Sequence, residues 1–215
     1  MSVVISGTSE GIGRAIALKF LSEGYSVIGY DIKESSIDDP KYTHVIHDIR
    51  DELCEDVSDA EIVIHSAGTL EERDALEVNL IGTIRFSEAF EKSPALRSVL
   101  FIASASARNG AEFPMYVSAK AGIVGYMKNR ALALAPRGIT VNSISPGGVI
   151  TGANSHILED EKLYSAVKAE TLLGKWAAPE EVADLAYYLT VQNRSITGED
   201  ILMDNGEMLR SNFIW

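Results

Sequence analysis

A glycine-rich turn close to the start of the chain places the strongest constraint on its fold. The preceding run Ser2–Ser6 is mostly apolar and β-branched, as is typical of a buried parallel strand, and helical periodicity begins after the turn. A turn between a strand and a helix N-terminus presents free N–H groups and the positive end of the helix dipole. Its glycines let the backbone approach a bound phosphate closely. We therefore predict a diphosphate site within residues 7–13, with an ordinary strand-to-helix turn as the alternative.

Strand-like and helix-like segments alternate along the rest of the chain. Short apolar runs predict further strands at 25–30, 44–47, 61–65, 98–102, 139–144 and 198–203. Helices are predicted at 14–23, 51–57, 71–92, 154–174 and 179–190, and in a segment that carries Tyr116 and Lys120 and ends near Pro136. The polar segment 33–42 leaves room for about one helical turn, and 105–114 is predicted to be a loop. This order predicts one domain over residues 1–215, an α/β doubly wound (Rossmann) parallel sheet in an α/β/α sandwich. Ligands of such folds bind at the carboxyl ends of the strands.

Composition narrows the class of partner. The net charge of −12 over 215 residues disfavours nucleic acid and anionic membrane surfaces. No segment approaches the ~18 apolar residues of a membrane helix, and the N-terminus lacks a signal-like run, so we expect a cytoplasmic protein. Cys54 is the only cysteine, which excludes an intrachain disulfide and a multi-cysteine metal site. Its acidic neighbours disfavour a thiolate, and we predict no metal.

Side chains that suit a dinucleotide follow directly after predicted strands. Asp31 ends the second strand, about 20 residues past the glycine turn, where a carboxylate accepts hydrogen bonds from an adenosine ribose. Its charge would repel a 2′-phosphate, which favours NAD over NADP; a simple turn aspartate is the alternative. Residues 66–68 are small enough for the backbone to pass close to a flat ligand. Ser104 ends the fifth strand, so these residues are expected to converge at one edge of the sheet.

Tyr116 and Lys120 lie four residues apart and therefore share one face of their predicted helix. An ammonium near a phenol stabilises the phenolate and lowers its pKa from a starting value of about 10. Such a tyrosine can give or take the proton that alcohol–ketone interconversion requires. The same spacing occurs by chance in amphipathic helices. The prediction that Tyr116 and Lys120 are catalytic therefore depends on the strand-end residues that are expected to lie around them.

The combined pattern resembles the short-chain dehydrogenase/reductase family over nearly the whole chain. Gly7-x-x-x-Gly11-Ile12-Gly13 is similar to its cofactor-binding glycine motif, and Ser66-Ala67-Gly68 stands where Asn-Ala-Gly is usual. Residues 196–198 and 204–206 resemble the C-terminal signature of the family. The resemblance implies a catalytic tetrad of Asn79, Ser104, Tyr116 and Lys120. It also implies cofactor contacts from Gly7, Ser9, Gly11, Ile12, Gly13, Asp31, Asp48, Ile49, Ala67, Gly68, Tyr116, Lys120, Pro146, Gly147 and Thr151.

The resemblance also implies a role for single residues. Asp48 and Ile49 would lie on the adenine, whereas Pro146, Gly147 and Thr151 would contact the nicotinamide carboxamide. Asn79 would hold a water between Lys120 and solvent; without the resemblance, an asparagine inside a helix would be expected to face solvent.

Some segments depart from the family pattern. Segments 31–48 and 68–79 are shorter than in most members, so peripheral helices are expected to be trimmed. Ser104 precedes Tyr116 by twelve positions, about one fewer than is usual in the family, which leaves Ser106 as the alternative active serine.

These features predict an oxidoreductase that transfers a hydride between NAD(H) and a secondary alcohol or ketone, with Tyr116 as general acid and base. The alternatives are a 3-oxoacyl thioester reductase that uses NADPH and a non-catalytic dinucleotide-binding regulatory protein. We expect a substrate lid at about 148–176. Its apolar residues, with Phe113 and Met115 on the opposite side, suggest a partly apolar substrate, although ordinary packing of the lid explains them equally well.

The family resemblance implies a homodimer or homotetramer. Small residues on the Tyr116 helix suit close approach between subunits, or equally close packing on the chain's own sheet. The apolar C-terminal residues 212–215 are expected to pack on a neighbouring subunit.

Overall fold

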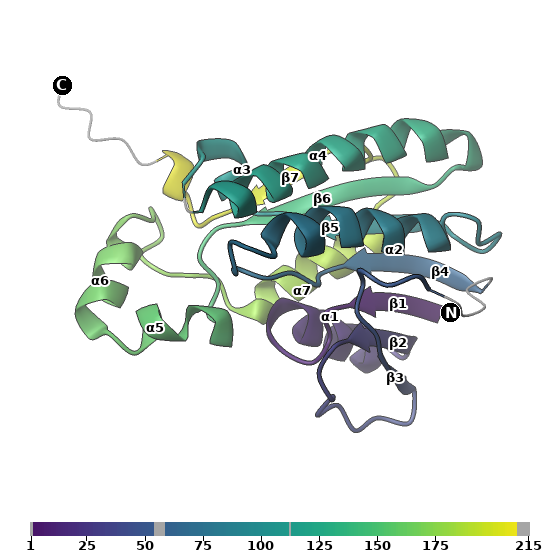
Figure 1. The fold of residues 1–215 in the computed structure, drawn as a ribbon, viewed down its shortest axis with the longest axis horizontal. Coiled ribbons are helices and arrows are strands. Elements are labelled where there is room, and N and C mark those ends of the chain that lie inside the picture. The colour runs from purple at the N-terminus through teal and green to yellow at the C-terminus, as the bar shows by residue number, and fades with distance from the viewer. Residues whose placement is uncertain (1, 54–58, 112, 210–215) are drawn as a thin grey trace.

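A seven-stranded sheet forms the centre of this computed structural model, which describes residues 2–53, 59–111 and 113–209. All strands run parallel in the order β3-β2-β1-β4-β5-β6-β7 (Figure 1). Their bounds are β1 (Ser2–Ser6), β2 (Ser26–Asp31), β3 (Tyr42–Ile46), β4 (Ala60–His65), β5 (Ser98–Ile102), β6 (Thr140–Pro146) and β7 (Asp200–Met203). The predicted doubly wound α/β fold is confirmed. Cys54 and residues 212–215, for which predictions were made above, lie outside the described residues.

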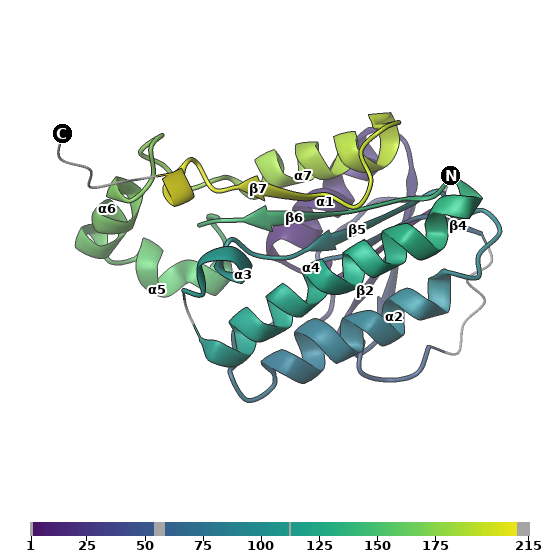
Figure 2. The same cartoon turned by 90° about the horizontal axis from the view of Figure 1, so that it is seen from above.

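Helices cover both faces of this sheet. They are α1 (Gly11–Ser22), α2 (Thr83–Phe90), α3 (Ser106–Asn109), α4 (Pro114–Leu134), α5 (Ser155–Leu158), α6 (Glu161–Ala169) and α7 (Pro179–Tyr187). Shorter or wider helical turns are η1 (Glu77–Gly82), η2 (Ala135–Arg137), η3 (Gly152–Asn154), η4 (Tyr188–Gln192) and η5 (Glu207–Leu209). Figure 2 shows α1 and α7 on one face and α2 and α4 on the other. Within the described residues, none of the helices combines the length and apolarity needed to cross a membrane.

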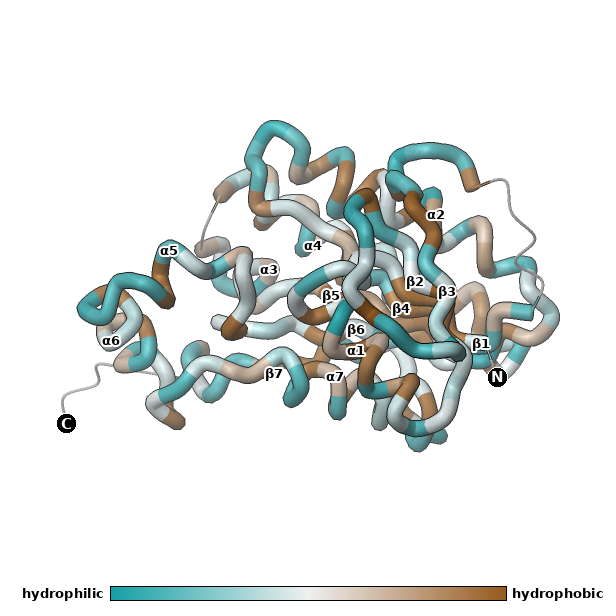
Figure 3. The backbone as a smooth tube through the Cα atoms, turned by 90° about the horizontal axis from the view of Figure 1, so that it is seen from below, coloured by the Kyte–Doolittle hydropathy of each residue, from teal (hydrophilic) through white to brown (hydrophobic). Residues whose placement is uncertain are grey.

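The central strands β1, β4 and β5 are mostly apolar on both faces because each face is buried under helices. In β4, Ile62 and Ile64 join the core on the side of α1 and α7, whereas Val63 joins the core on the side of α2 and α4. Side chains of a strand alternate between its two faces, so one short run supplies both layers of the core. Figure 3 shows the apolar residues gathered in the central strands.

The chain reverses its winding direction between β1 and β4, which are neighbours in the sheet. The loops that follow these two strands nearly touch: a Cβ on Gly7, whose φ is +79°, would lie 2.7 Å from the backbone of Ala67. A Cβ on Gly13 would overlap the carbonyl oxygen of Gly7. Both positions therefore require glycine, and the crevice between the two loops is where doubly wound sheets bind ligands. α1 begins at Gly11, earlier than the predicted start at residue 14, because the glycine turn itself forms the helix N-terminus.

The single helix predicted at 71–92 was wrong in its start and in its regularity. The segment becomes helical only at residues 75–76, widens into the π-helix η1 and continues as α2. Asn79 lies inside η1 and is buried, so it does not face solvent. Its side-chain amide bonds to the backbone of Thr69, an interaction that ordinary helical periodicity does not anticipate. π-turns of this kind are frequent at functional sites.

Other predicted helix boundaries also need correction. Residues 32–41 contain no helical turn, and 51–53 are not helical, whereas 54–57 lie outside the described residues. The predicted loop 105–114 contains α3, and the helix that starts at Pro179 continues beyond α7 as the π-helix η4.

Segment 150–176 leaves and rejoins the body of the protein at adjacent points. Ile150 N–H donates to the carbonyl of Ala177 at 2.9 Å, and Ala177 N–H donates to the carbonyl of Gly148 at 3.0 Å. The helix predicted at 154–174 is broken into α5 and α6, because Asp160 caps α6 by accepting hydrogen bonds from the N–H groups of Lys162 and Leu163. α5 and α6 therefore project together beyond the carboxyl ends of the strands (Figure 1).

Candidate active site

A cleft of about 850 Å³ lies at the carboxyl ends of the strands, next to α5 and α6. Nearly all predicted site residues line it, namely Gly7, Gly11, Ile12, Gly13, Asp31, Asp48, Ile49, Ala67, Gly68, Ser104, Tyr116, Lys120, Pro146, Gly147 and Thr151. Of the predicted residues, Ser9 and Asn79 do not line the cleft and act on residues that do, as described below.

Asp31 is held at the end of β2 with both carboxylate oxygens directed by backbone groups. Its Oδ2 accepts from the N–H of Ser9 at 2.9 Å, and its Oδ1 accepts from the N–H of Lys33 at 3.0 Å. The Ser9 hydroxyl in turn donates to the carbonyl of Lys33 at 2.9 Å. Each carboxylate oxygen has a further lone pair, so Asp31 can still accept hydrogen bonds from two neighbouring hydroxyls.

Basic side chains at this end of the cleft already have carboxylate partners. Lys33 Nζ lies 2.8 Å from Glu10 Oε1, and Arg50 Nη2 lies 2.6 Å from Asp48 Oδ2. Hydrogen bonds from Arg50 hold the pKa of Asp48 below its usual range. Asp31, in contrast, accepts its hydrogen bonds within the described residues from the backbone N–H groups of Ser9 and Lys33.

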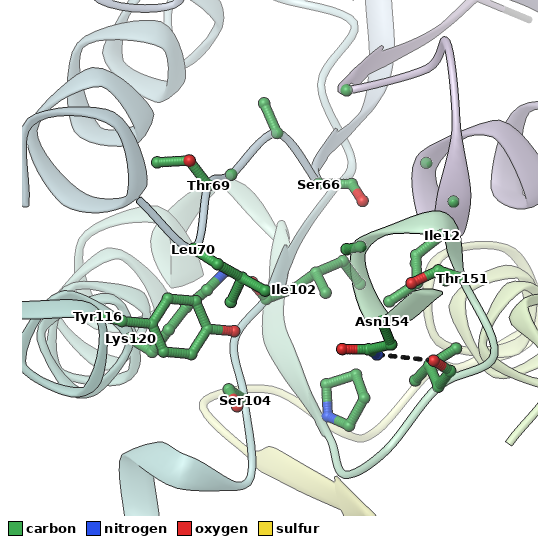
Figure 4. Close-up of a pocket in the computed structure, with 18 of the residues that line it drawn as sticks. Ile12, Ser66, Thr69, Leu70, Ile102, Ser104, Tyr116, Lys120, Thr151 and Asn154 are labelled. Atoms are coloured by element: carbon green, nitrogen blue, oxygen red, sulfur yellow. Dashed lines mark hydrogen bonds between the residues drawn. The ribbon is translucent and has the colours of Figure 1, made fainter. Parts of the chain in front are cut away.

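Tyr116 and Lys120 both face the cleft from the first turns of α4. Lys120 Nζ lies 5.7 Å from the centroid of the Tyr116 ring and donates to the carbonyl of Ile102 at 2.9 Å. The lysine side chain is buried, 6% exposed. Figure 4 shows Lys120 behind the Tyr116 ring and the phenol oxygen directed toward the space shared with Ser104. A buried cation is thus fixed beside a phenol that reaches the cleft.

Asn79 shapes the floor of the cleft beside this pair. Its Oδ1 accepts from the N–H of Thr69 at 2.7 Å, and its Nδ2 donates to the carbonyl of Thr69 at 2.8 Å. A Cβ on Gly68 would lie 3.0 Å from Asn79 Oδ1 and 3.6 Å from Lys120 Nζ. Asn79 in the π-turn therefore holds the loop after β4 close to Lys120. The water that Asn79 is expected to hold stays a prediction.

Ser104 and Ser106 both line the cleft and are both buried. Ser106 Oγ donates to Ser104 Oγ at 2.8 Å, and the Ser106 N–H donates to the same oxygen at 3.2 Å. The hydroxyl of Ser106 is thus directed at Ser104, which sits at the end of β5 near Tyr116 (Figure 4).

Glu72 is a contributor that the sequence did not single out. Its Oε1 accepts from the N–H of Met115 at 2.9 Å, next to Tyr116 in the first turn of α4. A carboxylate is favourable at a helix N-terminus, where backbone N–H groups lack helical partners. The two residues are 43 positions apart, so no local motif signals the contact.

The end of the cleft at which a substrate is expected is lined by residues from segment 150–176 and from η5. Ile157, Val167 and Trp176 contribute apolar surface, whereas Glu170 and Glu207 are acidic. Trp176 packs against Gly148 and meets the Tyr164 ring edge-on at a centroid distance of 5.8 Å. Phe113 and Met115, expected on the opposite side, do not line the cleft.

His65 is the buried last residue of β4 and directly precedes Ser66, which lines the cleft. Its ring stacks on Phe101 with centroids 4.6 Å apart, and no described residue hydrogen-bonds to either ring nitrogen. Complete burial lowers the pKa of His65 to about 3, so this histidine is neutral at ordinary pH.

Comparison with known proteins places this fold and cleft in a family. A family model described as "Enoyl-(Acyl carrier protein) reductase" matches residues 43–207, the greater part of the chain. An L-rhamnose 1-dehydrogenase (NADP(+)) of Thermoplasma acidophilum is 26% identical over 97% of this chain and 96% of its own length. The chain belongs to the short-chain dehydrogenase/reductase family.

Other members of the short-chain dehydrogenase/reductase family resemble the chain equally broadly. The 3-oxoacyl-(acyl-carrier-protein) reductase FabG of Salmonella typhimurium is 27% identical over 94% of this chain and 95% of its own length. A solved structure, 4-hydroxyisoleucine dehydrogenase complexed with NADH, has a TM-score of 0.87, 25% identity and coverage of 98% of this chain and 99% of that one. The chain is therefore an oxidoreductase of this family with a nicotinamide dinucleotide as cofactor.

Proposed function

We propose that this protein interconverts a secondary alcohol and a ketone with NAD(H), using Tyr116 as general acid and base. The observation that carries the proposal is the cleft itself, in which Tyr116, Lys120 and Ser104 share one space with the glycine turn and Asp31. The close packing around Gly7 and Gly13 leaves a cradle without side chains, which fits a diphosphate. When bound, the nicotinamide supplies the hydride transfer.

The chain's own residues handle the proton and the substrate oxygen. Tyr116 takes the hydroxyl proton in the oxidative direction and returns it in the reductive one. The buried Lys120 ammonium, beside the Tyr116 ring, stabilises the phenolate form. Ser104 donates a hydrogen bond to the substrate oxygen and stabilises its developing charge.

Cofactor preference follows from the charge at the end of β2. A 2′-phosphate placed beside Asp31 would meet a carboxylate, while the nearby Lys33 is already paired with Glu10. Two hydroxyls of an unphosphorylated ribose would instead satisfy the remaining lone pairs of Asp31. We therefore propose NAD, although the relatives include one named for NADP(+) and one solved with NADH.

A 3-oxoacyl thioester reductase that uses NADPH is the second candidate. It is favoured by the similarity to FabG, and the description of the matching family model also names an acyl-carrier-protein substrate, although for a different reduction. Asp31 speaks against NADPH, and the acidic Glu170 and Glu207 at the substrate end speak against an anionic carrier group. A purely regulatory dinucleotide-binding protein is disfavoured because the proton-transfer residues are all present and face one cleft.

Segment 148–176 is proposed as the substrate lid, because it supplies both apolar and acidic lining residues. The proposed partners are a small alcohol or ketone and further copies of this chain, in a homodimer or homotetramer. Nucleic acid, a membrane surface and a metal have no place in this proposal, and the cytoplasm is its proposed location.

A substrate panel tests the proposed function directly. Purified protein is offered neutral, cationic and anionic secondary alcohols and ketones, and acetoacetyl thioesters, each with NAD(H) and with NADP(H), while nicotinamide absorbance is followed. We expect turnover of alcohols or ketones with NAD(H). Turnover confined to thioesters with NADPH would support the second candidate, and NADH binding without any turnover would support a regulatory protein.

A further inference from the structure

The Ser104 oxygen has both of its acceptor positions filled by one neighbour. Ser106 donates to it twice, through its hydroxyl at 2.8 Å and through its backbone N–H at 3.2 Å. A serine hydroxyl has two lone pairs and one hydrogen. Because both lone pairs are engaged, Ser104 can form a further hydrogen bond only as a donor. Ser104 lines the cleft, so this bond can be directed into it.

We propose that Ser106 is a positioning residue that makes Ser104 a dedicated hydrogen-bond donor to the substrate oxygen. Without Ser106, the Ser104 hydroxyl could rotate and accept as well as donate. With Ser106 in place, turning the Ser104 hydroxyl hydrogen toward Ser106 would bring it close to the hydroxyl hydrogen that Ser106 already donates, and the two would repel each other. Accepting hydrogen bonds also polarises the Ser104 O–H and makes it a stronger donor as the substrate oxygen gains negative charge.

An ion pair fixes the short helix that carries Ser106. α3 has four residues and would not be stable alone. Arg108 of α3 donates to Asp200 Oδ2 through Nε at 3.0 Å and through Nη2 at 2.8 Å, and its Nη2 also bonds to the Asp200 carbonyl. Asp200 is the first residue of β7, so this pair ties α3 to the edge of the sheet.

The Asp200 carboxylate is itself held in place by β6. Its Oδ1 accepts from the hydroxyls of Ser143 and Ser145 at 2.7 Å each, and its side chain is 8% exposed. Both carboxylate oxygens are therefore occupied, and the pair is shielded from water on the side of the carboxylate. The helix α3, which carries Ser106, is therefore held in place by β7 and, through Asp200, by β6.

A double-mutant cycle measures the coupling between the two serines. Because this inference rests on the proposed alcohol–ketone chemistry, it uses the best substrate of the panel with Ser104→Ala, Ser106→Ala and the double variant. We expect Ser106→Ala to lower kcat about tenfold with KM within about twofold, since the lost polarisation matters most in the transition state. In the Ser104→Ala background, Ser106→Ala should have no further effect. Equal losses in both backgrounds, or an unchanged kcat, would overturn the proposal.

Ser98→Ala is the matched control. Ser98 is a buried serine at the other end of β5, and it also accepts from a hydroxyl, that of Thr140 at 3.0 Å. Its loss should leave kcat unchanged. NADH affinity should be alike in wild type and Ser106→Ala, because it does not depend on how the Ser104 hydrogen points. The thermal midpoint should fall by only a few degrees, the usual effect of losing one buried hydrogen bond.

Neutron diffraction from crystals exchanged into D₂O tests the same inference without turnover. We expect one deuteron on the line from Ser106 Oγ to Ser104 Oγ and the Ser104 deuteron directed into the cleft. A Ser104 deuteron directed at Ser106 would overturn the inference even if the enzyme is active. If the panel finds no substrate, the proposed function fails, while the deuteron positions still decide this hydrogen-bond arrangement.

Discussion

Tyr116 shows how much of the proposed chemistry depends on one hydroxyl. Its ring is held by α4 next to the buried Lys120, and its oxygen faces the cleft. We expect Tyr116→Phe to lower kcat by about 10²–10⁴-fold, the usual contribution of general acid–base catalysis, while NADH titration still gives near wild-type affinity. Tyr188→Phe, which removes an exposed phenol oxygen elsewhere, is the control and should be silent. Wild-type turnover by Tyr116→Phe would remove this tyrosine from the mechanism.

Asp31 is expected to set the cofactor preference through its charge. Asp31→Asn keeps the shape of the side chain and removes the repulsion of a 2′-phosphate. We expect the ratio of NADPH to NADH affinity to rise about tenfold, which corresponds to about 1.4 kcal/mol. Fluorescence titrations with both cofactors measure it. The control is Asp38→Asn, an exposed carboxylate in the same connection between strands, for which the ratio should stay constant.

His65 is expected to make folding stability depend on pH. The unfolded chain takes up a proton near the ordinary histidine pKa of 6.5, whereas the folded protein resists until about pH 3. Below pH 6.5 the unfolded state therefore binds more protons, and stability falls by up to about 1.4 kcal/mol per pH unit. Between pH 6.5 and 5 this histidine alone should remove about 2 kcal/mol of the free energy of unfolding.

Denaturant unfolding at pH 7.5, 6.5 and 5 tests this for wild type, His65→Phe and His156→Gln. His65→Phe should flatten the pH dependence by that amount, because a phenyl ring keeps the stacking on Phe101 without a proton site. His156 is exposed and lies far along the chain in α5, so its loss should leave the slope as in wild type. Identical slopes for all three proteins would contradict the assignment to His65.

At the scale of elements, the proposed lid is anchored where it leaves β6. A Cβ on Gly148 would overlap the Trp176 ring, which is 8% exposed and lines the cleft. Gly148→Ala should displace this ring, lower the thermal midpoint and raise KM severalfold, since Trp176 borders the proposed substrate space. Gly152→Ala is the matched control, because a Cβ there meets nothing within 4 Å. An unchanged KM in Gly148→Ala would show that the lid anchor does not reach the substrate.

At the scale of the whole molecule, we propose that one face of α4 forms the interface of the expected oligomer. Gly122 is explained within the chain, since a Cβ there would lie 2.8 Å from the side chain of Leu80. Gly125 is exposed with nothing within 4 Å of a Cβ, and Leu132 on the same side of the helix is 79% exposed. An exposed glycine inside a helix costs about 1 kcal/mol relative to alanine, which close approach of a second copy would offset.

We expect wild-type protein to have the mass of a dimer or tetramer in light scattering. Gly125→Leu should reduce that mass toward 23.3 kDa, because the added side chain would keep a second helix away. Ala166→Leu places the same leucine side chain at an exposed position of α6 and should leave the mass unchanged. A monomeric wild type, or an unaffected Gly125→Leu, would refute an interface through this face.

Local sequence was enough for the features that local physics controls. Strands buried on both faces are apolar runs, and parallel strands need crossovers, so alternation alone predicted the fold that β1–β7 confirm. Gly7 and Gly13 were recognisable because they lie in a turn between a predicted strand and a predicted helix. Asp31 and Pro146 were recognisable because each ends a strand, and Ser104 because it follows the end of β5 by two residues. Residues that end neighbouring parallel strands meet at one edge, so most of the cleft could be predicted.

The tertiary structure decided what depends on contacts between distant residues. Asn79 in the π-turn bonds to the backbone of Thr69, and Glu72 accepts a hydrogen bond at the N-terminus of α4. The helix predicted at 154–174 is interrupted at Asp160 because that residue caps α6. The relation of Ser104 to Ser106 also needed coordinates, because neither serine has the spacing to Tyr116 that is usual in the family. Periodicity and motif spacing predict on which face of a helix or strand a side chain lies. They do not predict which atom a polar side chain bonds to, because its partners come from distant parts of the chain and meet only in the folded protein.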